Sequence, residues 1–387
     1  MRTALIVLVL WAAGLGAAAQ FGKISVIYDL LGDRYAGAGG AARIGLLVSV
    51  VGSVGLIFGT TAGILVSRIG PKRAIVGALG LGAAMSVLEA SFPAYPVMIA
   101  ARVLEGVSHL AIVVVGPTVI AAISAPRYLG LAMTLWASFF GVTYAALALI
   151  APPLVRWGGA ESLFFAHAGW LLVCAGLLSV MMPPDRVLPP VPGRKSVILR
   201  HVEIYSSPSV AAPAMGFLCY TVLYVALLTL LPPLMPPQYV ALVATGMPLV
   251  SIAVSLTLGV WLLGKITPVS LVQGGFAVAA LAMLGVWASW GQGLALVASV
   301  FVMAAAFGIV QGASFASIPF LNRSSDDRAG AAGAVAQLGN LGTTTGTPLL
   351  ALILSQSGAA GLAAFVIPFC IAGIVLHAVQ KRRRNTG

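Results

Sequence analysis

The chain has 387 residues, of which 60% are hydrophobic and only 8% are charged, and its formal net charge is +12 at pH 7. A soluble domain carries roughly 25% charged residues, so this composition excludes a water-soluble globular protein and makes lipid the natural solvent. The long unbroken apolar runs favour membrane-spanning helices over a β-barrel, whose strands would alternate with a period of two.

Apolar runs follow one another along the whole chain, and each is long enough to cross a bilayer, which takes about 20 residues. The first run begins after Met1-Arg2 and resembles a secretory signal, but we read it as a span because its apolar stretch extends to Phe21. The expected spans are 4–24, 43–66, 72–91, 96–121, 129–153, 162–182, 209–231, 239–263, 268–289, 293–320, 329–354 and 359–379.

The placement of basic residues supports this count and gives the orientation. With twelve spans, Arg102 is the one of the 21 Lys and Arg residues that lies inside a span, and most of the rest fall on the side of both termini. The positive-inside rule then predicts that both termini are cytoplasmic, as in a multi-pass protein of the inner membrane. The same clustering at span ends argues against nucleic-acid binding. The basic residues expected on the opposite side are Lys23, Arg34, Arg43 and Arg156.

A Pro-rich polar segment, 183–208, divides the chain into two halves of six spans each. Its composition indicates a semi-rigid cytoplasmic linker rather than a domain. We therefore expect an N-terminal six-helix bundle over 1–182 and a C-terminal six-helix bundle over 209–387, related as parallel repeats. A short similarity supports the repeat, because Glu105-Gly106-Val107-Ser108 in span four resembles Gln311-Gly312-Ala313-Ser314 in span ten.

Ionisable residues inside a membrane are costly and are functional candidates by default. Arg102, Glu105 and His109 all lie in span four, at spacings that place them on one helix face. Arg102 and Glu105 can pair locally, and Glu105 and His109 can exchange a proton, so this face predicts a proton-coupling site. The alternative is an ion pair that only fixes helix packing. We expect the face to lie at the interface between the two halves.

Polar and aromatic stripes in other spans would complete a substrate cavity with aromatic walls and a few polar anchors. For any single aromatic residue, ordinary helix packing is the alternative. Glu89 and His167 are not included, because Glu89 is expected at the membrane interface and His167 in a scaffold helix. The candidates are Trp136 and Tyr144 in span five, Tyr220 and Tyr224 in span seven, Gln311 in span ten, and Gln337 and Asn340 in span eleven.

The sequence contains no sign of catalytic or metal chemistry. Cys174, Cys219 and Cys370 lie inside apolar runs without the spacing of metal ligands or of a disulfide framework. A nucleophile constellation and a phosphate-binding loop are also missing. We therefore expect neither an enzyme nor a bound metal or cofactor.

The segment from Gly63 to Arg73 is similar to the signature loop between spans two and three of the major facilitator superfamily. The match rests on Gly63, Arg68, Gly70, Lys72 and Arg73, and the sequence departs from the family pattern at Ser67, where the family usually has Asp. Arg102-Val103-Leu104-Glu105-Gly106 also resembles the family's span-four motif. The span-five Gly-Pro motif of drug/proton antiporters is not evident.

This resemblance implies an all-α fold of two pseudo-symmetric six-helix bundles that works by alternating access, with the signature loop acting in gating. It implies a secondary transporter but not its substrate. Arg102 and His109 in the cavity are compatible with a small organic solute, anionic solutes included, and with coupling to protons. We further expect a monomer surrounded by membrane lipids. Two alternatives stay open: an exporter of apolar compounds, and a non-transporting assembly factor for a membrane complex. The substrate, the direction of transport and the coupling ion cannot be read from the sequence.

Overall fold

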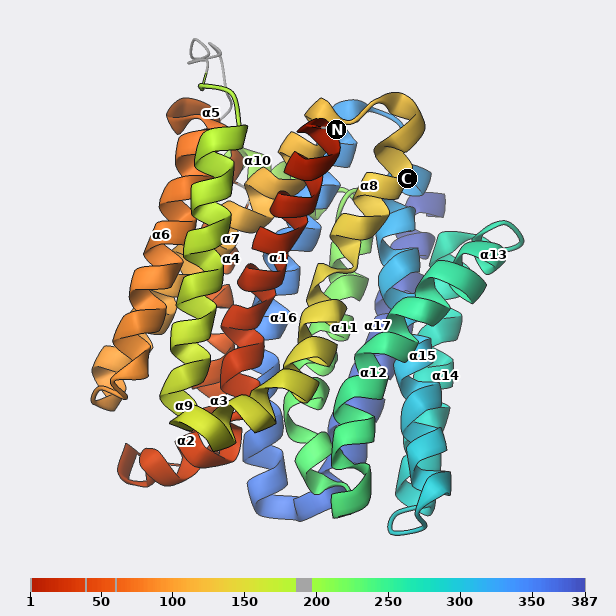
Figure 1. Cartoon of the computed structure of the whole chain (residues 1–387). Coiled ribbons are helices and arrows are strands. Elements are labelled where there is room, and N and C mark those ends of the chain that lie inside the picture. Colours follow the sequence, from red (N-terminus) through yellow and green to blue (C-terminus); the bar gives the residue numbers. More distant parts are fainter. Residues whose placement is uncertain (1, 39, 60, 186–196, 387) are drawn as a thin grey trace. The chain divides into compact units, whose positions relative to one another are not determined.

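The computed structural model describes residues 2–38, 40–59, 61–185 and 197–386, which are almost entirely helical and contain no strand (Figure 1). Up to the linker, the elements are α1 (Arg2–Val26), α2 (Tyr28–Arg34), η1 (Ala36–Ala38), α3 (Ala41–Ser49), α4 (Gly52–Phe58), α5 (Ala62–Ile69), α6 (Pro71–Ala90), α7 (Tyr95–Ile123), α8 (Pro126–Ala137) and α9 (Phe139–Met181). From the linker onward they are α10 (Val197–Ser206), α11 (Ala211–Leu230), η2 (Pro232–Leu234), η3 (Pro237–Tyr239), α12 (Val240–Val254), η4 (Ser255–Gly259), α13 (Val260–Leu263), α14 (Pro268–Ala288), α15 (Leu294–Leu321), α16 (Ser325–Ser357), η5 (Gly358–Ala360) and α17 (Gly361–Thr386).

The chain forms two compact units. Unit 1 comprises Met1–Gly39 and Val50–Arg194, and unit 2 comprises Gly40–Ser49 and Lys195–Gly387. The second segment of unit 2 thus begins inside the expected linker, while α3 joins unit 2 although it lies in the N-terminal half of the sequence. The middle of the linker, residues 186–196, lies outside the described residues.

Nine helical stretches of the described residues are long and apolar enough to cross a membrane, or ten when the bent pair α3 and α4 is taken as one span. Two of these stretches contain a break. One is α9, where Gly158 and Gly159 leave the helical conformation, and the other runs from Asp326 to Asn385 through α16 and α17. This division is consistent with the twelve expected spans, and it confirms an all-helical membrane fold.

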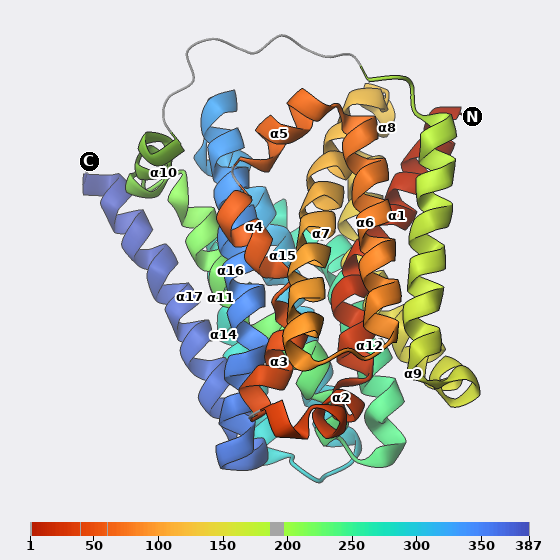
Figure 2. The same cartoon turned by 90° about the vertical axis from the view of Figure 1, so that its left-hand side faces the viewer.

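The second expected span, 43–66, is not one continuous helix. It is divided into α3, α4 and α5, and α3 and α4 meet at an angle of 62° (Figure 2). Ser49 at the end of α3 donates a hydrogen bond to the carbonyl oxygen of Thr344 on α16, at 2.8 Å, and Gly45 lies against the backbone of Pro348. These contacts attach α3 to α16 and explain why it belongs to unit 2.

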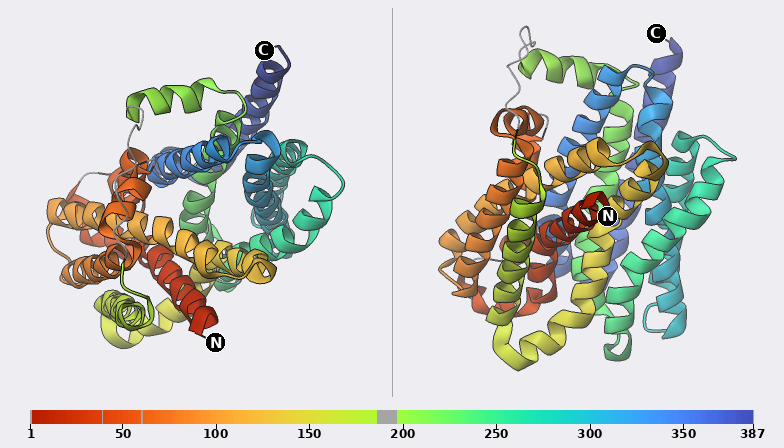
Figure 3. Two further views of the ribbon diagram at one scale, coloured as in Figure 1. Left: turned by 90° about the horizontal axis from the view of Figure 1, so that it is seen from above. Right: turned by 45° about the horizontal axis from the view of Figure 1, so that its top comes forward.

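The expected linker contains a helix that its Pro-rich composition did not indicate. Helix α10 lies across the ends of the long helices of unit 2 (Figure 3). Tyr205 on α10 donates a hydrogen bond to the side-chain oxygen of Gln337 on α16, at 2.8 Å, and Ile204 is buried. The linker segment is therefore partly a packed element of unit 2.

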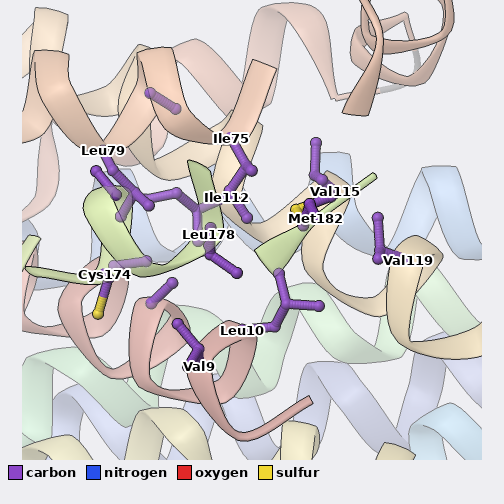
Figure 4. Packing of buried hydrophobic residues seen from close by; sticks show 14 of the residues in the cluster. Val9, Leu10, Ile75, Leu79, Ile112, Val115, Val119, Cys174, Leu178 and Met182 are labelled. Atoms are coloured by element: carbon purple, nitrogen blue, oxygen red, sulfur yellow. The ribbon is translucent and has the colours of Figure 1, made fainter. Parts of the chain in front are cut away.

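The apolar core of unit 1 is built from α1, α6, α7 and the second arm of α9 (Figure 4). Leu10, Leu79, Ile112 and Leu178, one from each of these helices, are fully buried in it. A glycine notch completes the packing, because the indole of Trp136 on α8 lies where a Cβ atom of Gly116 would stand. This core occupies one end of the four helices and leaves polar residues at the other.

Helices α11 and α16 pack very closely in unit 2. A Cβ atom on Gly346 would stand 2.0 Å from the carbonyl oxygen of Val222, and one on Gly342 would stand 2.2 Å from the hydroxyl of Thr221. The two glycines are four residues apart on one face, the spacing that lets the backbones of membrane helices approach closely. The pair α11–α16 is therefore held together by backbone contact.

Candidate functional site

Two acids and two bases meet inside unit 1, beyond the apolar core. The Nζ atom of Lys23 on α1 lies 2.6 Å from Glu105 Oε1 on α7 and 2.7 Å from Glu89 Oε2 on α6. Arg102 pairs with Glu105 and lies 3.7 Å from Glu89 Oε1. All four side chains are 0% exposed. Their formal charges cancel, so this buried charge cluster is neutral as a whole.

Neutral polar groups complete the cluster. Lys23 also donates to the hydroxyl of Ser86, at 3.0 Å, and lies 3.2 Å from Nδ1 of His167 on α9. Nε2 of His167 lies 2.9 Å from the carbonyl oxygen of Gly16, which can only accept, so Nε2 carries the proton and Nδ1 is left to accept. Arg102 donates its other amino group to the carbonyl oxygen of Gln20. Four helices, α1, α6, α7 and α9, are thus tied together by one network.

Aromatic residues cover the end of the network. The ring of Phe164 lies 5.1 Å below Lys23 Nζ and is contacted edge-on by Phe92. Tyr35, which follows α2, donates a hydrogen bond to the carbonyl oxygen of Pro93, at 2.7 Å. Burial raises the pKa of Tyr35 above its ordinary value, so its hydroxyl keeps the donated proton. Phe92 and Pro93 belong to the loop between α6 and α7, so this loop packs over the end of the network.

An apolar cavity of about 210 Å³ lies between α1 and the two arms of α9. Its lining includes Lys23 and His167, and the rest is almost wholly aliphatic or aromatic. The cavity therefore leads from the α1–α9 surface to the edge of the charge cluster.

The structure corrects three expectations about this region. Lys23 was expected at the membrane surface, but α1 continues to Val26 and turns its ammonium group inward. Glu89 is buried rather than reaching the protein surface, and His167 takes part in the site from its expected helix, since both contact Lys23. The sequence signal that could have found them is simply that each is ionisable and lies inside an apolar run, which is costly unless the groups pair.

His109 does not join the network through Glu105. Its Nδ1 lies 3.1 Å from the carbonyl oxygen of Ala17, and its ring packs edge-on against Phe21. The imidazole beside Glu105 is instead that of His167, whose Nδ1 lies 3.8 Å from Glu105 Oε1. A direct Glu105–His109 relay is therefore not what the geometry supports. The described contacts of Arg102 and Glu105 come from unit 1, so their placement toward the other half stays a prediction.

Of the aromatic residues expected in span five, Trp136 has a packing role in the glycine notch described above. Tyr144 on α9 stacks on Phe140, and its hydroxyl lies 3.3 Å from that of Ser25 on α1. Trp136 and Tyr144 lie on different helices, because a short break at Ser138 separates α8 from α9.

The candidates in unit 2 are distributed over several environments. Tyr220 and Tyr224 on α11 stack with their ring centroids 5.0 Å apart, and both contact Phe307 on α15 edge-on. Gln311 is half-buried on α15. Gln337 is engaged by Tyr205, and Asn340 donates to the carbonyl oxygen of Ala336 in its own helix, at 2.8 Å. The tyrosine pair is thus the candidate that forms a cluster.

At the signature loop, the N-terminus of α6 is capped by an acid that the sequence analysis did not indicate. Gly70 ends α5 with φ +97 and begins α6. The carboxylate of Asp185, just beyond α9, accepts hydrogen bonds from the backbone N–H groups of Lys72, at 2.8 Å, and Arg73, at 2.9 Å. Lys72 also donates its ammonium group to the carbonyl oxygen of Met182, whereas Arg68 is exposed. The side-chain surroundings of Gly63 and Ser67 lie outside what the structure describes.

We expect Asp185→Asn to lower the stability of unit 1 by about 1–2 kcal/mol, because it removes a negative charge from two backbone donors at a helix N-terminus. The measurement is the shift of the thermal unfolding midpoint of the purified protein in detergent. Asp33→Asn, at an exposed position on α2, is the matched control. An equal shift in both variants would contradict the capping role of Asp185.

The charge cluster brings two buried acids against two cations, and the four groups come from three helices, α1, α6 and α7. Among the described residues, no group of three or more His, Cys, Asp or Glu side chains could hold a metal ion. A buried acid whose two cationic partners come from different helices can change its contacts when it takes up a proton. This all-helical fold with charges buried among its spans defines a polytopic membrane protein.

Comparison with known proteins agrees with that class. The family model described as Major Facilitator Superfamily matches residues 6–339. The chain belongs to this superfamily, and the predicted resemblance is confirmed. It is therefore a multi-pass membrane transporter and not an enzyme.

Two solved structures are similar over nearly the whole chain. One is a D-xylose–proton symporter, with a TM-score of 0.76 and 14% identity, covering 97% of this chain and 96% of the symporter. The other is a bacterial homologue of the human lysosomal transporter Spinster, inward-facing and unoccupied, with a TM-score of 0.71 and 13% identity, covering 98% of this chain and 95% of that one. No curated protein sequence matches the chain.

Proposed function

We propose that this protein is a proton-coupled secondary transporter that carries a small organic solute across the inner membrane by alternating access. The observation that carries the proposal is the buried charge cluster of Lys23, Glu89, Arg102 and Glu105. We place both termini in the cytoplasm, from the distribution of basic residues, and propose that the monomer is the working unit.

The cluster supports proton coupling because its contacts depend on its charge. Glu105 holds Lys23 of α1 and Arg102 of its own helix at the same time. A proton on Glu105 would remove the negative charge that holds them and leave the cluster with one excess positive charge. The links from α1 to α7 would then weaken, while Lys23 would keep its contact with Glu89 on α6. Proton binding would thus favour a different arrangement of these helices.

The similarity to a solved D-xylose–proton symporter supports this proposal, since that protein couples solute movement to protons on the same fold. The covered position of the cluster is also suitable, because a coupling proton must not leak freely between the two sides. The cavity between α1 and α9 is the described opening that reaches the edge of the cluster.

We expect Glu105→Gln to abolish solute accumulation driven by a pH gradient, because it keeps the shape of the side chain and removes its titration. Exchange of solute at equal concentrations should continue. Both are measured in proteoliposomes, and the infrared carbonyl band of a protonated carboxylic acid gives a readout that needs no solute. In the original protein this band should appear on acidification, and the part of it that comes from Glu105 should be missing in the variant.

The matched control is Glu161→Gln, the same substitution at an exposed position of α9. It should behave as the unmodified protein in all three measurements. If Glu105→Gln still accumulates solute with the original pH dependence, Glu105 is not the coupling group and the cluster is only structural.

A further inference from the structure

The buried charges of the chain leave none available for a charged solute. In the described residues, the buried Lys, Arg, Asp and Glu side chains are the four members of the charge cluster, two positive and two negative. Each contacts at least one member of opposite sign within 4 Å.

Among the described residues of unit 2, the polar groups in the buried interior are all neutral. They offer hydroxyl, amide and imidazole groups and carry no formal acid or ammonium charge. Its buried polar side chains are Ser49, Thr221, Thr229, Ser251, Ser289, Ser314, Ser317, Asn322, Thr347, His377 and Gln380.

A charged solute that leaves water needs an opposite charge to replace its hydration. Any partner taken from the cluster would abandon its present one: if Arg102 turned to a solute carboxylate, Glu105 would lose a cation and the cluster would lose its neutrality. An anionic solute was expected because Arg102 and His109 would face the cavity, but Arg102 is held by Glu105 and His109 by the carbonyl oxygen of Ala17.

The aromatic residues of α11 indicate what a neutral solute would meet. Phe217, Tyr220 and Tyr224 form a continuous stack, with ring centroids 5.3 Å and 5.0 Å apart. The hydroxyl of Tyr220 is buried and has no hydrogen-bond partner among the described residues. Buried polar groups normally have a partner, so an unpaired hydroxyl beside an aromatic stack is suited to a ligand that supplies one.

We infer that the transported solute is uncharged, and that it combines hydroxyl or carbonyl groups with a ring-sized face that packs on the aromatic stack around Tyr220. The inference rests on the transport function proposed above and narrows its substrate class. It requires only that the solute pass through the membrane-spanning part of the chain, where every buried charge among the described residues has a partner of opposite sign.

The test uses two sets of matched probes that share a scaffold and differ in charge. One set is D-glucose, gluconate and glucosamine, and the other is myo-inositol, quinate and an amino-cyclitol, all at slightly acidic pH. Uptake into proteoliposomes under a proton gradient is measured by mass spectrometry. We expect at least one uncharged member to accumulate about tenfold or more above its charged analogues.

Every outcome decides the substrate class. The inference of an uncharged solute is overturned if a charged member is taken up as well as or better than its uncharged analogue. It is also overturned if none of the probes is taken up. The proposed function is judged separately, by the pH gradient and by Glu105→Gln. Uptake of a charged probe that needs the gradient and fails in Glu105→Gln would leave proton-coupled transport standing. Uptake of an uncharged probe without any gradient dependence would contradict the coupling alone.

A second measurement tests the role of Tyr220. Tyr220→Phe keeps the stacked ring and removes the hydroxyl, so half-saturation by an accumulated uncharged probe should require about tenfold more solute. Without solute, the thermal stability should not fall, because no hydrogen bond is lost. Tyr128→Phe, at an exposed site on α8, is the matched control. Unchanged half-saturation in Tyr220→Phe would overturn the contact with the solute.

Discussion

Lys23→Met is expected to destabilise unit 1 by about 3–5 kcal/mol, the usual cost of removing one partner from a buried ion pair. The substitution keeps much of the side-chain volume but leaves Glu89 and Glu105 facing Arg102 as the remaining cation. The thermal unfolding midpoint in detergent should fall by several degrees, and the yield of monodisperse protein should fall with it. Lys265→Met, at an exposed position after α13, should have little effect.

The double variant Lys23→Met/Glu89→Gln separates charge balance from the loss of individual contacts. It leaves Arg102 and Glu105 as one neutral pair, so we expect it to recover most of the stability lost in Lys23→Met. A double-mutant cycle with the two single variants gives the coupling energy. If the two effects simply add, or if Lys23→Met alone is as stable as the original protein, the cluster is not held together by its charge balance.

Gly346→Ala is expected to destabilise unit 2 by about 1–3 kcal/mol through overpacking. The new methyl group would stand 2.0 Å from the carbonyl oxygen of Val222, and a backbone atom cannot rotate away as a flexible side chain can. Helices α11 and α16 would have to separate. Since α11 carries Tyr220 and Tyr224, we also expect weaker solute binding, measured by half-saturation of uptake.

Gly274→Ala is the matched control for this effect. Gly274 also lies within a long helix, α14, but a Cβ atom there would meet nothing within 4 Å. Alanine has the higher helix propensity, so this variant should be as stable as the original protein or slightly more stable. A loss of stability in Gly274→Ala equal to that in Gly346→Ala would show that close helix approach is not the cause.

Local pairing within one helix could be predicted in the candidate site, and pairing between helices could not. Arg102 and Glu105 are three residues apart on α7, and the structure confirms the pair that this spacing predicts. Lys23, Glu89 and His167 come from α1, α6 and α9. Only the packing of these helices brings them to the same depth, so the sequence separations of the three residues contain no comparable signal.

The signature loop shows the same limit. The sequence predicts a turn at Gly70 and a missing acid at Ser67, but it does not indicate which residue could cap α6. Asp185 is more than a hundred residues away from the N–H groups that it accepts from. The end of α9 brings it there. A helix N-terminus accepts any nearby carboxylate, so the physical need was predictable while its provider was not.

The sequence by itself determined that this protein lies in a membrane, and it determined the fold class and the family. Those properties depend on average composition, on the length of apolar runs and on short motifs such as the one from Arg68 to Arg73, which are all read locally. The tertiary structure alone decided that α3 joins unit 2 and that Lys23 turns inward to form a neutral cluster. Both depend on contacts between helices far apart in the chain, where the cost of a buried charge or an unpaired polar group is met by whichever partner the packing brings near.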